Sequence, residues 1–153
     1  MFLLQIRYLS FFFGLISILS FFNIIYSYYL NLYLNLHTYY LSLILSLILS
    51  ILFYKIKISE KKPSMYSKIF TVFFGYLVVP LILSIPFYFS IYNLTFLNSY
   101  FESISGFTST GFTTFVNIKH IDQSLILWRS STQWIGGLYF LFSIIYLIDI
   151  YDD

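Results

Sequence analysis

A short run of hydroxyl side chains with one glycine, Thr108-Ser109-Thr110-Gly111-Phe112, stands out because long apolar stretches flank it on both sides. Backbone carbonyls that face one axis can replace the water shell of a dehydrated monovalent cation. Keeping successive carbonyls on one side demands unusual backbone angles, which Gly111 accepts without steric cost. The hydroxyls could add oxygen ligands or brace the loop from behind. Neutral oxygen donors without clustered carboxylates suit potassium or sodium better than calcium or a transition metal.

The residues before this run predict a short helix over about 98–106. Ser99 followed by Glu102 fits a capping box, and Gly106 fits a left-handed C-terminal stop. About two turns of helix cannot cross a bilayer, but they can enter it and point their C-terminal carbonyls, which carry about half a negative charge, towards a cation. A polar loop of this kind is tolerated where it lines a cavity that holds water or ions. An ordinary polar extracellular turn is the alternative.

The composition places these residues in a membrane protein. Of 153 residues, 59% are hydrophobic, 24% aromatic and only 9% charged, whereas a soluble domain usually carries about 25% charged residues. The absence of cysteine excludes disulfides and thiol metal sites. Basic residues are sparse and cluster in one loop, so no nucleic-acid partner is expected. His37 and His120 are isolated, and no nucleophile–base grouping or phosphate-binding loop supports an enzyme.

The first half of the chain predicts a helical hairpin over 1–54. No Asp, Glu, Lys or Arg occurs from Tyr8 to Tyr54, and a single helix of that length would exceed twice the hydrocarbon core of about 30 Å. The run must therefore fold back, and the polar residues between 31 and 37 mark the turn. A signal peptide is disfavoured because the run is too long and no cleavage site follows. The predicted spans cover about 8–29 and 38–54.

Serines in these two spans recur at helical spacing. Ser42, Ser46 and Ser50 share one face of the second span, and Ser10 and Gly14 share one face of the first. Small residues at this spacing let helix backbones approach closely in lipid. Helix packing is therefore favoured over a hydroxyl-lined transport path.

A basic loop over 55–68 predicts the orientation. It contains five lysines against the single Glu60, and an excess of lysine in a short loop marks the cytoplasmic side. Both termini are then expected inside a plasma or inner membrane, with 93–123 beginning and ending outside.

A third span is expected over about 69–92, and a fourth over about 124–148. Pro80 and Pro86 should kink the third span, because each removes a backbone hydrogen bond. Arg129, in the first turns of the fourth, can snorkel towards the outer headgroups or pair with a carboxylate.

Two motifs carry a resemblance to a known family. Phe101-Glu102-Ser103-Ile104-Ser105-Gly106-Phe107-Thr108-Ser109-Thr110-Gly111-Phe112 resembles the first pore loop of the TrkH/KtrB potassium transporters. Leu127-Trp128-Arg129-Ser130-Ser131-Thr132-Gln133-Trp134-Ile135-Gly136-Gly137 resembles the start of the helix that follows that loop. The order and separation of the motifs match, and the resemblance covers about 96–148. The hairpin is similar only in topology, to the extra N-terminal helix pair of the TrkH branch.

The resemblance implies an all-α integral membrane fold, in which the hairpin precedes one membrane helix–pore loop–membrane helix unit over 69–153. The filter would lie around 108–112, with Gly111 as the family's filter glycine. Potassium would be held at Thr108, Ser109, Thr110 and Gly111. Gly136 and Gly137 would let the fourth helix pack tightly against the pore helix. Glu102 is expected to cap the pore helix, to hold a cation at the outer mouth, or to pair with Arg129.

The family has four such units around one pore, whereas this chain has one. The partners implied are therefore the lipid bilayer and three further pore-loop units, supplied by a longer chain, a split subunit or homotetramer copies. A longer or split transporter is expected, because the sequence stops soon after the fourth span. A cytosolic nucleotide-binding regulatory subunit is a further partner of the family. The expected function is passive or ion-coupled uptake of potassium, or of sodium, without a covalent cofactor; the alternative is a non-conducting subunit or truncated remnant that packs against a partner.

Overall fold

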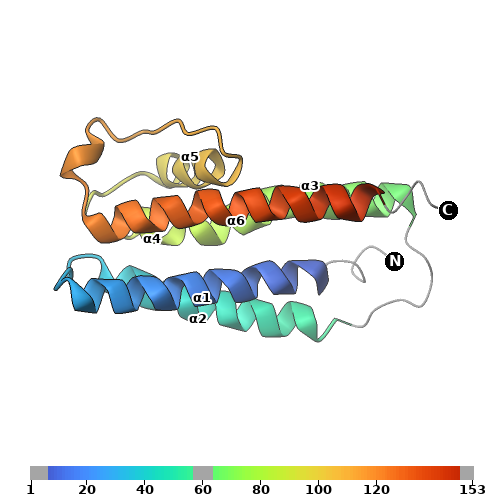
Figure 1. Cartoon of the computed structure of the whole chain (residues 1–153), viewed down its shortest axis with the longest axis horizontal. Coiled ribbons are helices and arrows are strands. Elements are labelled where there is room, and N and C mark those ends of the chain that lie inside the picture. The colour runs from blue at the N-terminus through green and yellow to red at the C-terminus, as the bar shows by residue number, and fades with distance from the viewer. Residues whose placement is uncertain (1–6, 57–63, 149–153) are drawn as a thin grey trace.

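The computed structural model describes residues 7–56 and 64–148, and its regular elements over these ranges are all helical. Four long helices lie side by side, and a short helix packs against one end of the bundle (Figure 1). The elements in chain order are α1 (Arg7–Tyr29), α2 (Leu36–Tyr54), α3 (Met65–Leu83), α4 (Ile85–Tyr88), α5 (Phe96–Phe107), the 3-10 turn η2 (Ile118–His120) and α6 (Gln123–Ile148).

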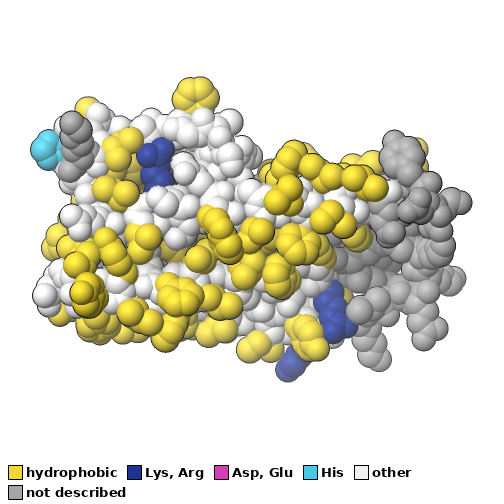
Figure 2. All heavy atoms as spheres, in the orientation of Figure 1, with side chains coloured by type: hydrophobic (Ala, Val, Ile, Leu, Met, Phe, Trp, Pro, Cys, Tyr) yellow, Lys and Arg dark blue, Asp and Glu magenta, His cyan; other side chains and the backbone are white. Residues whose placement is uncertain are grey.

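Four helices are long and apolar enough to cross a membrane, with α3 and α4 together forming one of them. Large hydrophobic side chains cover much of the outside of the bundle (Figure 2), whereas many serines and threonines are buried. The buried interior also contains an apolar core that includes Phe12, Phe87 and Trp128, and so much exposed apolar surface is unusual for a water-soluble protein. The predicted class, an all-α integral membrane protein in contact with lipid, is confirmed.

Hydroxyl groups join α1 to α2. Ser10 Oγ donates to the Ser50 carbonyl at 2.9 Å, and Ser50 Oγ donates back to the Ser10 carbonyl at 3.0 Å. Ser20 and Ser42 bond through their hydroxyls at 3.2 Å. The serine faces therefore serve helix packing, as their spacing predicts.

The turn between α1 and α2 ends two residues earlier than expected. Asn31 adopts a left-handed φ of 56°, and the Leu32 amide returns to the Ser27 carbonyl at 2.8 Å. Helix α2 already begins at Leu36, so His37 lies in its first turn rather than in the loop.

The third span begins at Met65 and not near residue 69, because Ser64 caps it by accepting a hydrogen bond from the Ser67 amide. Pro80 lies inside α3, and the helix breaks at Ser84, two residues before Pro86 in the first turn of α4. The span, which α3 and α4 form together, ends at Tyr88 rather than near residue 92. Half of the basic loop, residues 57–63, lies outside the described residues, as do the acidic residues after 148.

A polar cluster at the end of the bundle near α5 joins three connections, and the sequence did not predict it. Asn35 is buried; its Nδ2 donates to Asp122 Oδ2 at 3.1 Å, and its Oδ1 accepts from the Ile91 amide at 3.1 Å. Ser124 also donates to Asp122 Oδ2, and its hydroxyl bonds Tyr39 at 2.9 Å. The cluster ties the α1–α2 turn and the segment after α4 to the start of α6.

Candidate ion filter

Helix α5 and the loop after it lie at the same end of the bundle as the α1–α2 turn (Figure 1). Helix α5 covers only part of the length of α6, and the chain after it returns towards the end from which it came. The chain thus enters and leaves this region at one end of the bundle, and the C-terminal end of α5 lies farthest from that end.

The capping box predicted at Ser99 and Glu102 is wrong. Helix α5 begins one turn earlier, at Phe96, and Thr95 is its N-cap, accepting from the Asn98 amide at 3.3 Å. Ser99 and Glu102 therefore lie inside the helix, where Ser99 Oγ donates to the Thr95 carbonyl at 3.0 Å. Threonine is nearly as good an N-cap as serine.

The buried face of α5 is polar, and its exposed face is apolar. Ser99, Glu102 and Ser103 are fully buried, whereas Leu97 and Phe101 are exposed. The polar face packs against the kinked third span, where Ser103 Oγ donates to the Pro80 carbonyl at 2.8 Å. Tyr100, at the side of the helix, donates to the Leu77 carbonyl at 3.0 Å.

Two glycines allow α6 to approach the end of α5. A β-carbon at Gly136 would collide with the backbone of Phe107, and one at Gly106 would collide with the Thr132 side chain. Gly106 is therefore needed for close packing, and its predicted role as a left-handed stop is wrong. The tight packing predicted for Gly137 is also wrong, because a β-carbon there would meet nothing within 4 Å.

The left-handed stop is Ser109, with φ of 57°. Its amide donates to the Gly106 carbonyl at 2.9 Å, and the Thr110 amide donates to the Ser105 carbonyl at 3.0 Å. These two bonds form a Schellman motif, in which glycine is the usual left-handed residue. Gly111 follows with φ of 79°, as the sequence predicted. A serine held at positive φ is a local cost that proteins tend to tolerate at functional sites.

The segment from 108 to 112 is exposed on the surface of this chain, and side chains brace it from behind. Thr108 Oγ1 donates to the Ile104 carbonyl at 2.8 Å and lies 3.0 Å from Thr110 Oγ1. Ser105 Oγ donates to the Phe112 carbonyl at 2.7 Å. Of the two roles that the sequence left open for the hydroxyls, these contacts support bracing for Thr108 and Thr110.

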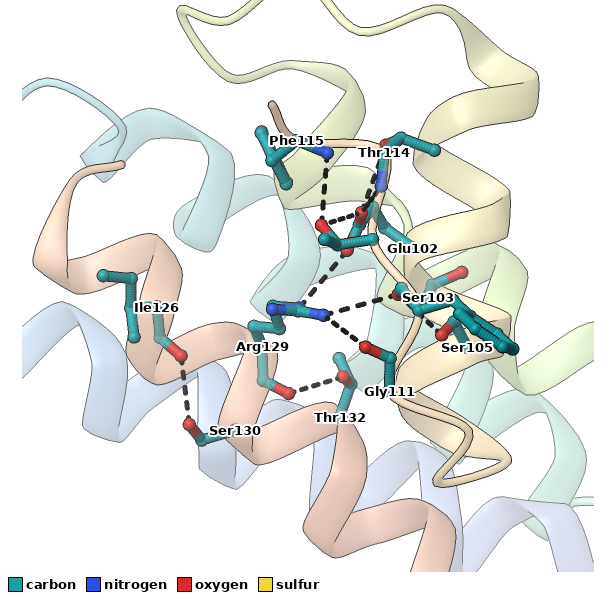
Figure 3. Close-up of polar contacts among 12 residues, drawn as sticks. Glu102, Ser103, Ser105, Gly111, Thr114, Phe115, Ile126, Arg129, Ser130 and Thr132 are labelled. Atoms are coloured by element: carbon teal, nitrogen blue, oxygen red, sulfur yellow. Dashed lines mark hydrogen bonds and ion pairs between the residues drawn. The ribbon is translucent and has the colours of Figure 1, made fainter. Parts of the chain in front are cut away.

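An ion pair between Glu102 and Arg129 lies behind the segment (Figure 3), and it confirms the predicted pairing. Glu102 Oε2 is 3.3 Å from Arg129 Nε, with the glutamate side chain fully buried and the arginine 14% exposed. Glu102 Oε1 accepts from Thr113 Oγ1 at 2.6 Å, from Thr114 Oγ1 at 3.1 Å and from the Thr114 amide. The carboxylate therefore fixes Thr113 and Thr114, the two residues that directly follow the segment.

Arg129 also bonds the segment itself. Its Nη2 donates to the Gly111 carbonyl at 3.3 Å and to the Phe112 carbonyl at 3.4 Å. Helix α6 thus contacts the segment through Arg129 and the end of α5 through Gly136. The sequence did not predict the bonds to the carbonyls, because nothing in the chain order indicates where the guanidinium points.

A hollow of about 440 Å³ opens beside the end of α5. It is lined by Tyr76, Phe107, Thr108, Ser109, Gly136, Gly137 and Phe140. The bare backbone of Gly137 contributes to this space. Within the described residues, no three His, Cys, Asp or Glu side chains gather as a metal site. The oxygen atoms available at the segment are peptide carbonyls and hydroxyls, which are ligands for an alkali cation rather than a transition metal.

Residues 35–150 match the family model of TrkH, a cation transport protein, over more than half of the chain. The chain belongs to the TrkH family. The match includes α2, α3, α5, the segment after α5 and α6, so the resemblance seen in the two motifs is confirmed.

Curated TrkH relatives match a shorter stretch. The chain is 38% identical over 64 residues to an uncharacterized cation transporter of Methanocaldococcus jannaschii, covering 42% of this chain and 14% of the relative. It is 40% identical over 60 residues to the Trk system potassium uptake protein TrkI of Halomonas elongata, covering 39% and 11%. It is 41% identical over 56 residues to the corresponding TrkH of Escherichia coli, covering 36% and 12%. The matched part is thus about one eighth of these relatives. No solved structure matches the chain significantly.

Proposed function

We propose that this chain forms one filter unit of a potassium uptake transporter in the cell membrane. The observation that carries the proposal is the re-entrant α5, which ends in an exposed, braced segment with two left-handed residues, Ser109 and Gly111. Membership of the TrkH family and the names of the potassium uptake relatives support the same function. Sodium is the alternative cargo, since neutral oxygens bind both ions.

The proposed mechanism is dehydration at a ring of oxygens. A cation that sheds its water binds backbone carbonyls of Thr108, Ser109 and Thr110, while the C-terminal dipole of α5 favours its positive charge. The Gly111 carbonyl, which the sequence also assigned to the ion, accepts from Arg129 instead. Bracing by Ser105, Thr108 and Thr110 stops the loop from collapsing when the cation leaves. Movement follows the electrochemical gradient, either passively or coupled to another ion.

One unit supplies a quarter of such a ring, so three further pore-loop units must complete the pore. The exposure of the segment and of the apolar face of α5 at Leu97 and Phe101 supports this, because both would be covered by neighbours. The units could come from the rest of a longer chain, a split subunit or copies of this chain. A cytosolic nucleotide-binding subunit would regulate the assembly, with the N- and C-termini of this chain on the cytoplasmic side. The competing function is a non-conducting subunit or truncated remnant.

Growth of a potassium-uptake-deficient host at low potassium tests the proposal. We expect the chain, expressed with the units that complete it, to restore growth and the uptake of 86Rb⁺. Gly111→Ala should abolish both, because alanine at a φ of 79° is strained by roughly 1 kcal/mol or more and would turn the carbonyls of the segment.

Gly14→Ala is the matched control. Gly14 lies in α1, and a β-carbon there would make an ordinary contact of 3.4 Å with Ser50 Oγ. This variant should grow as the wild type does. If the wild type moved no alkali cation, or if Gly111→Ala conducted normally, the non-conducting alternative would replace the proposal.

A further inference from the structure

Arg129 places a full positive charge against the proposed cation path. Its Nη2 lies 3.3 Å from the Gly111 carbonyl oxygen and 3.4 Å from that of Phe112 (Figure 3). An uncompensated guanidinium at this position would repel a cation bound to the neighbouring oxygens, because charges a few ångströms apart interact strongly where water is scarce. A cation filter with this arginine behind it needs a compensating negative charge.

Glu102 supplies that charge. Its Oε2 is 3.3 Å from Arg129 Nε, and its side chain is fully buried. The other oxygen, Oε1, is held by donors from Thr113 and Thr114, so the carboxylate has little freedom to leave the pair. Asp122 is the other carboxylate within the described ranges, and it bonds Asn35 and Ser124 instead. Only Glu102 contacts Arg129 as a counter-charge in the part of the chain that the structure describes.

Arg129 also turns two carbonyls away from the exposed side of the segment. The Gly111 and Phe112 oxygens accept from Nη2, and the Phe112 oxygen accepts from Ser105 Oγ as well. No hydrogen bond from another described residue reaches the carbonyl oxygens of Thr108, Ser109 or Thr110. The carbonyls of the segment therefore fall into two groups: those of Gly111 and Phe112, which bond Arg129, and those of residues 108–110, which are available to an ion.

We propose that Arg129 positions the filter backbone through the Gly111 and Phe112 carbonyls, and that Glu102 cancels the charge of Arg129 where the cation passes. The inference rests on the proposed function. It adds that the pair determines the apparent affinity through charge and the selectivity through geometry, and that these two effects can be separated.

Opposite shifts of KM distinguish this role from a structural one. In Glu102→Gln the positive charge remains alone, and KM for Rb⁺ should rise about tenfold or more, the effect of one charge a few ångströms away at an effective dielectric constant of about 20. In Arg129→Gln the carboxylate remains, still held by Thr113 and Thr114, and KM should fall several-fold. The double variant is neutral again, and its KM should return to within about threefold of wild type. If the two residues only stabilised the fold, the variants would lower the amount of active protein. They would not shift KM in opposite directions.

Selectivity reports the positioning separately. Arg129→Lys keeps the charge, but a lysine ammonium lacks the planar fork that bonds Glu102 and two carbonyls together. Its KM should stay within about threefold of wild type, while the preference for Rb⁺ over Na⁺ falls. Ser130→Ala is the matched control on α6, because Ser130 is exposed and bonds only the Ile126 carbonyl of its own helix. It should change neither quantity.

The experiment measures initial rates of 86Rb⁺ uptake over a range of Rb⁺ concentrations, with and without competing Na⁺, in the fully assembled transporter. Detergent-extracted protein on a sizing column gives the folded amount, which alters Vmax but not KM. Shifts of KM in the same direction for the two single variants, or a double variant no better than Glu102→Gln, would overturn the inference while leaving the proposed function intact. A wild type that takes up no Rb⁺ would instead overturn the proposed function and this inference with it.

Discussion

At the scale of single residues, the adjacent glycines of α6 have opposite surroundings. Gly136 lies against the backbone of Phe107, which cannot move without shifting the end of α5, whereas Gly137 faces open space. Both glycines were expected to have the same role, because a pair of neighbouring glycines carries no sign of which one faces the partner helix. Only the contact with Phe107 distinguishes the two glycines.

We expect Gly136→Ala to lower the thermal stability of the purified protein by an amount corresponding to about 1–3 kcal/mol, since overpacking against a backbone is poorly relieved. Gly137→Ala should leave stability unchanged or raise it by up to about 1 kcal/mol, because alanine is the better helix former. Thermal unfolding in detergent, followed by tryptophan fluorescence, measures both. Equal losses of stability in the two variants would contradict the assigned contact.

At the scale of the elements, α5 is held at both ends and along one side. Thr95 caps its start, the Schellman motif at Ser109 closes its end, and the hydroxyls of Tyr100 and Ser103 join it to carbonyls of α3. A helix of three turns is marginal by itself. Its stability must come from these attachments and from its packing against α6, which also determine where the filter segment begins.

The position of the cap can be tested with two variants. Thr95→Ala should destabilise the protein by about 1 kcal/mol, the usual cost of losing an N-cap. Ser99→Ala should cost less than half as much, because the Thr95 carbonyl that accepts from Ser99 Oγ keeps its bond to the Ser99 amide. Chemical unfolding of the two variants side by side gives the difference. If Ser99→Ala lost more stability than Thr95→Ala, Ser99 would be the N-cap and the assignment of Thr95 would be wrong.

At the scale of the whole molecule, the α1–α2 turn and the loop after α5 lie at one end of the bundle, opposite the start of α1 and the end of α6 (Figure 1). The polar cluster of Asn35, Asp122 and Ser124 joins these connections at that end. In a membrane, this arrangement puts the turn and the loop on the same side, with the filter segment reached from there.

Single cysteines can test this arrangement cleanly, since the sequence contains none of its own. We expect Asn31→Cys and Val116→Cys to react with an impermeant maleimide from outside the cell, because residue 31 lies in the turn and Val116 is fully exposed. Lys55→Cys, at the other end of α2, should react only after the membrane is opened. If residue 116 reacted together with residue 55, α5 would cross the membrane and the re-entrant loop would be wrong.

The sequence by itself determined the membrane class, the four spans to within about four residues, the left-handed Gly111 and the family. The first three follow from local properties, namely the length of an apolar run and a glycine among hydroxyl residues, and the family follows from the resemblance of two motifs. Only the tertiary structure decided where helix α5 begins and ends, with Thr95 as its N-cap and Ser109 as its left-handed stop. It also decided that Gly136 rather than Gly137 packs against α5, and that Arg129 bonds carbonyls of the segment after α5. The physical reason is that each of these depends on which group a neighbouring helix presents at a few ångströms, and residues far apart in the chain carry no mark of that pairing.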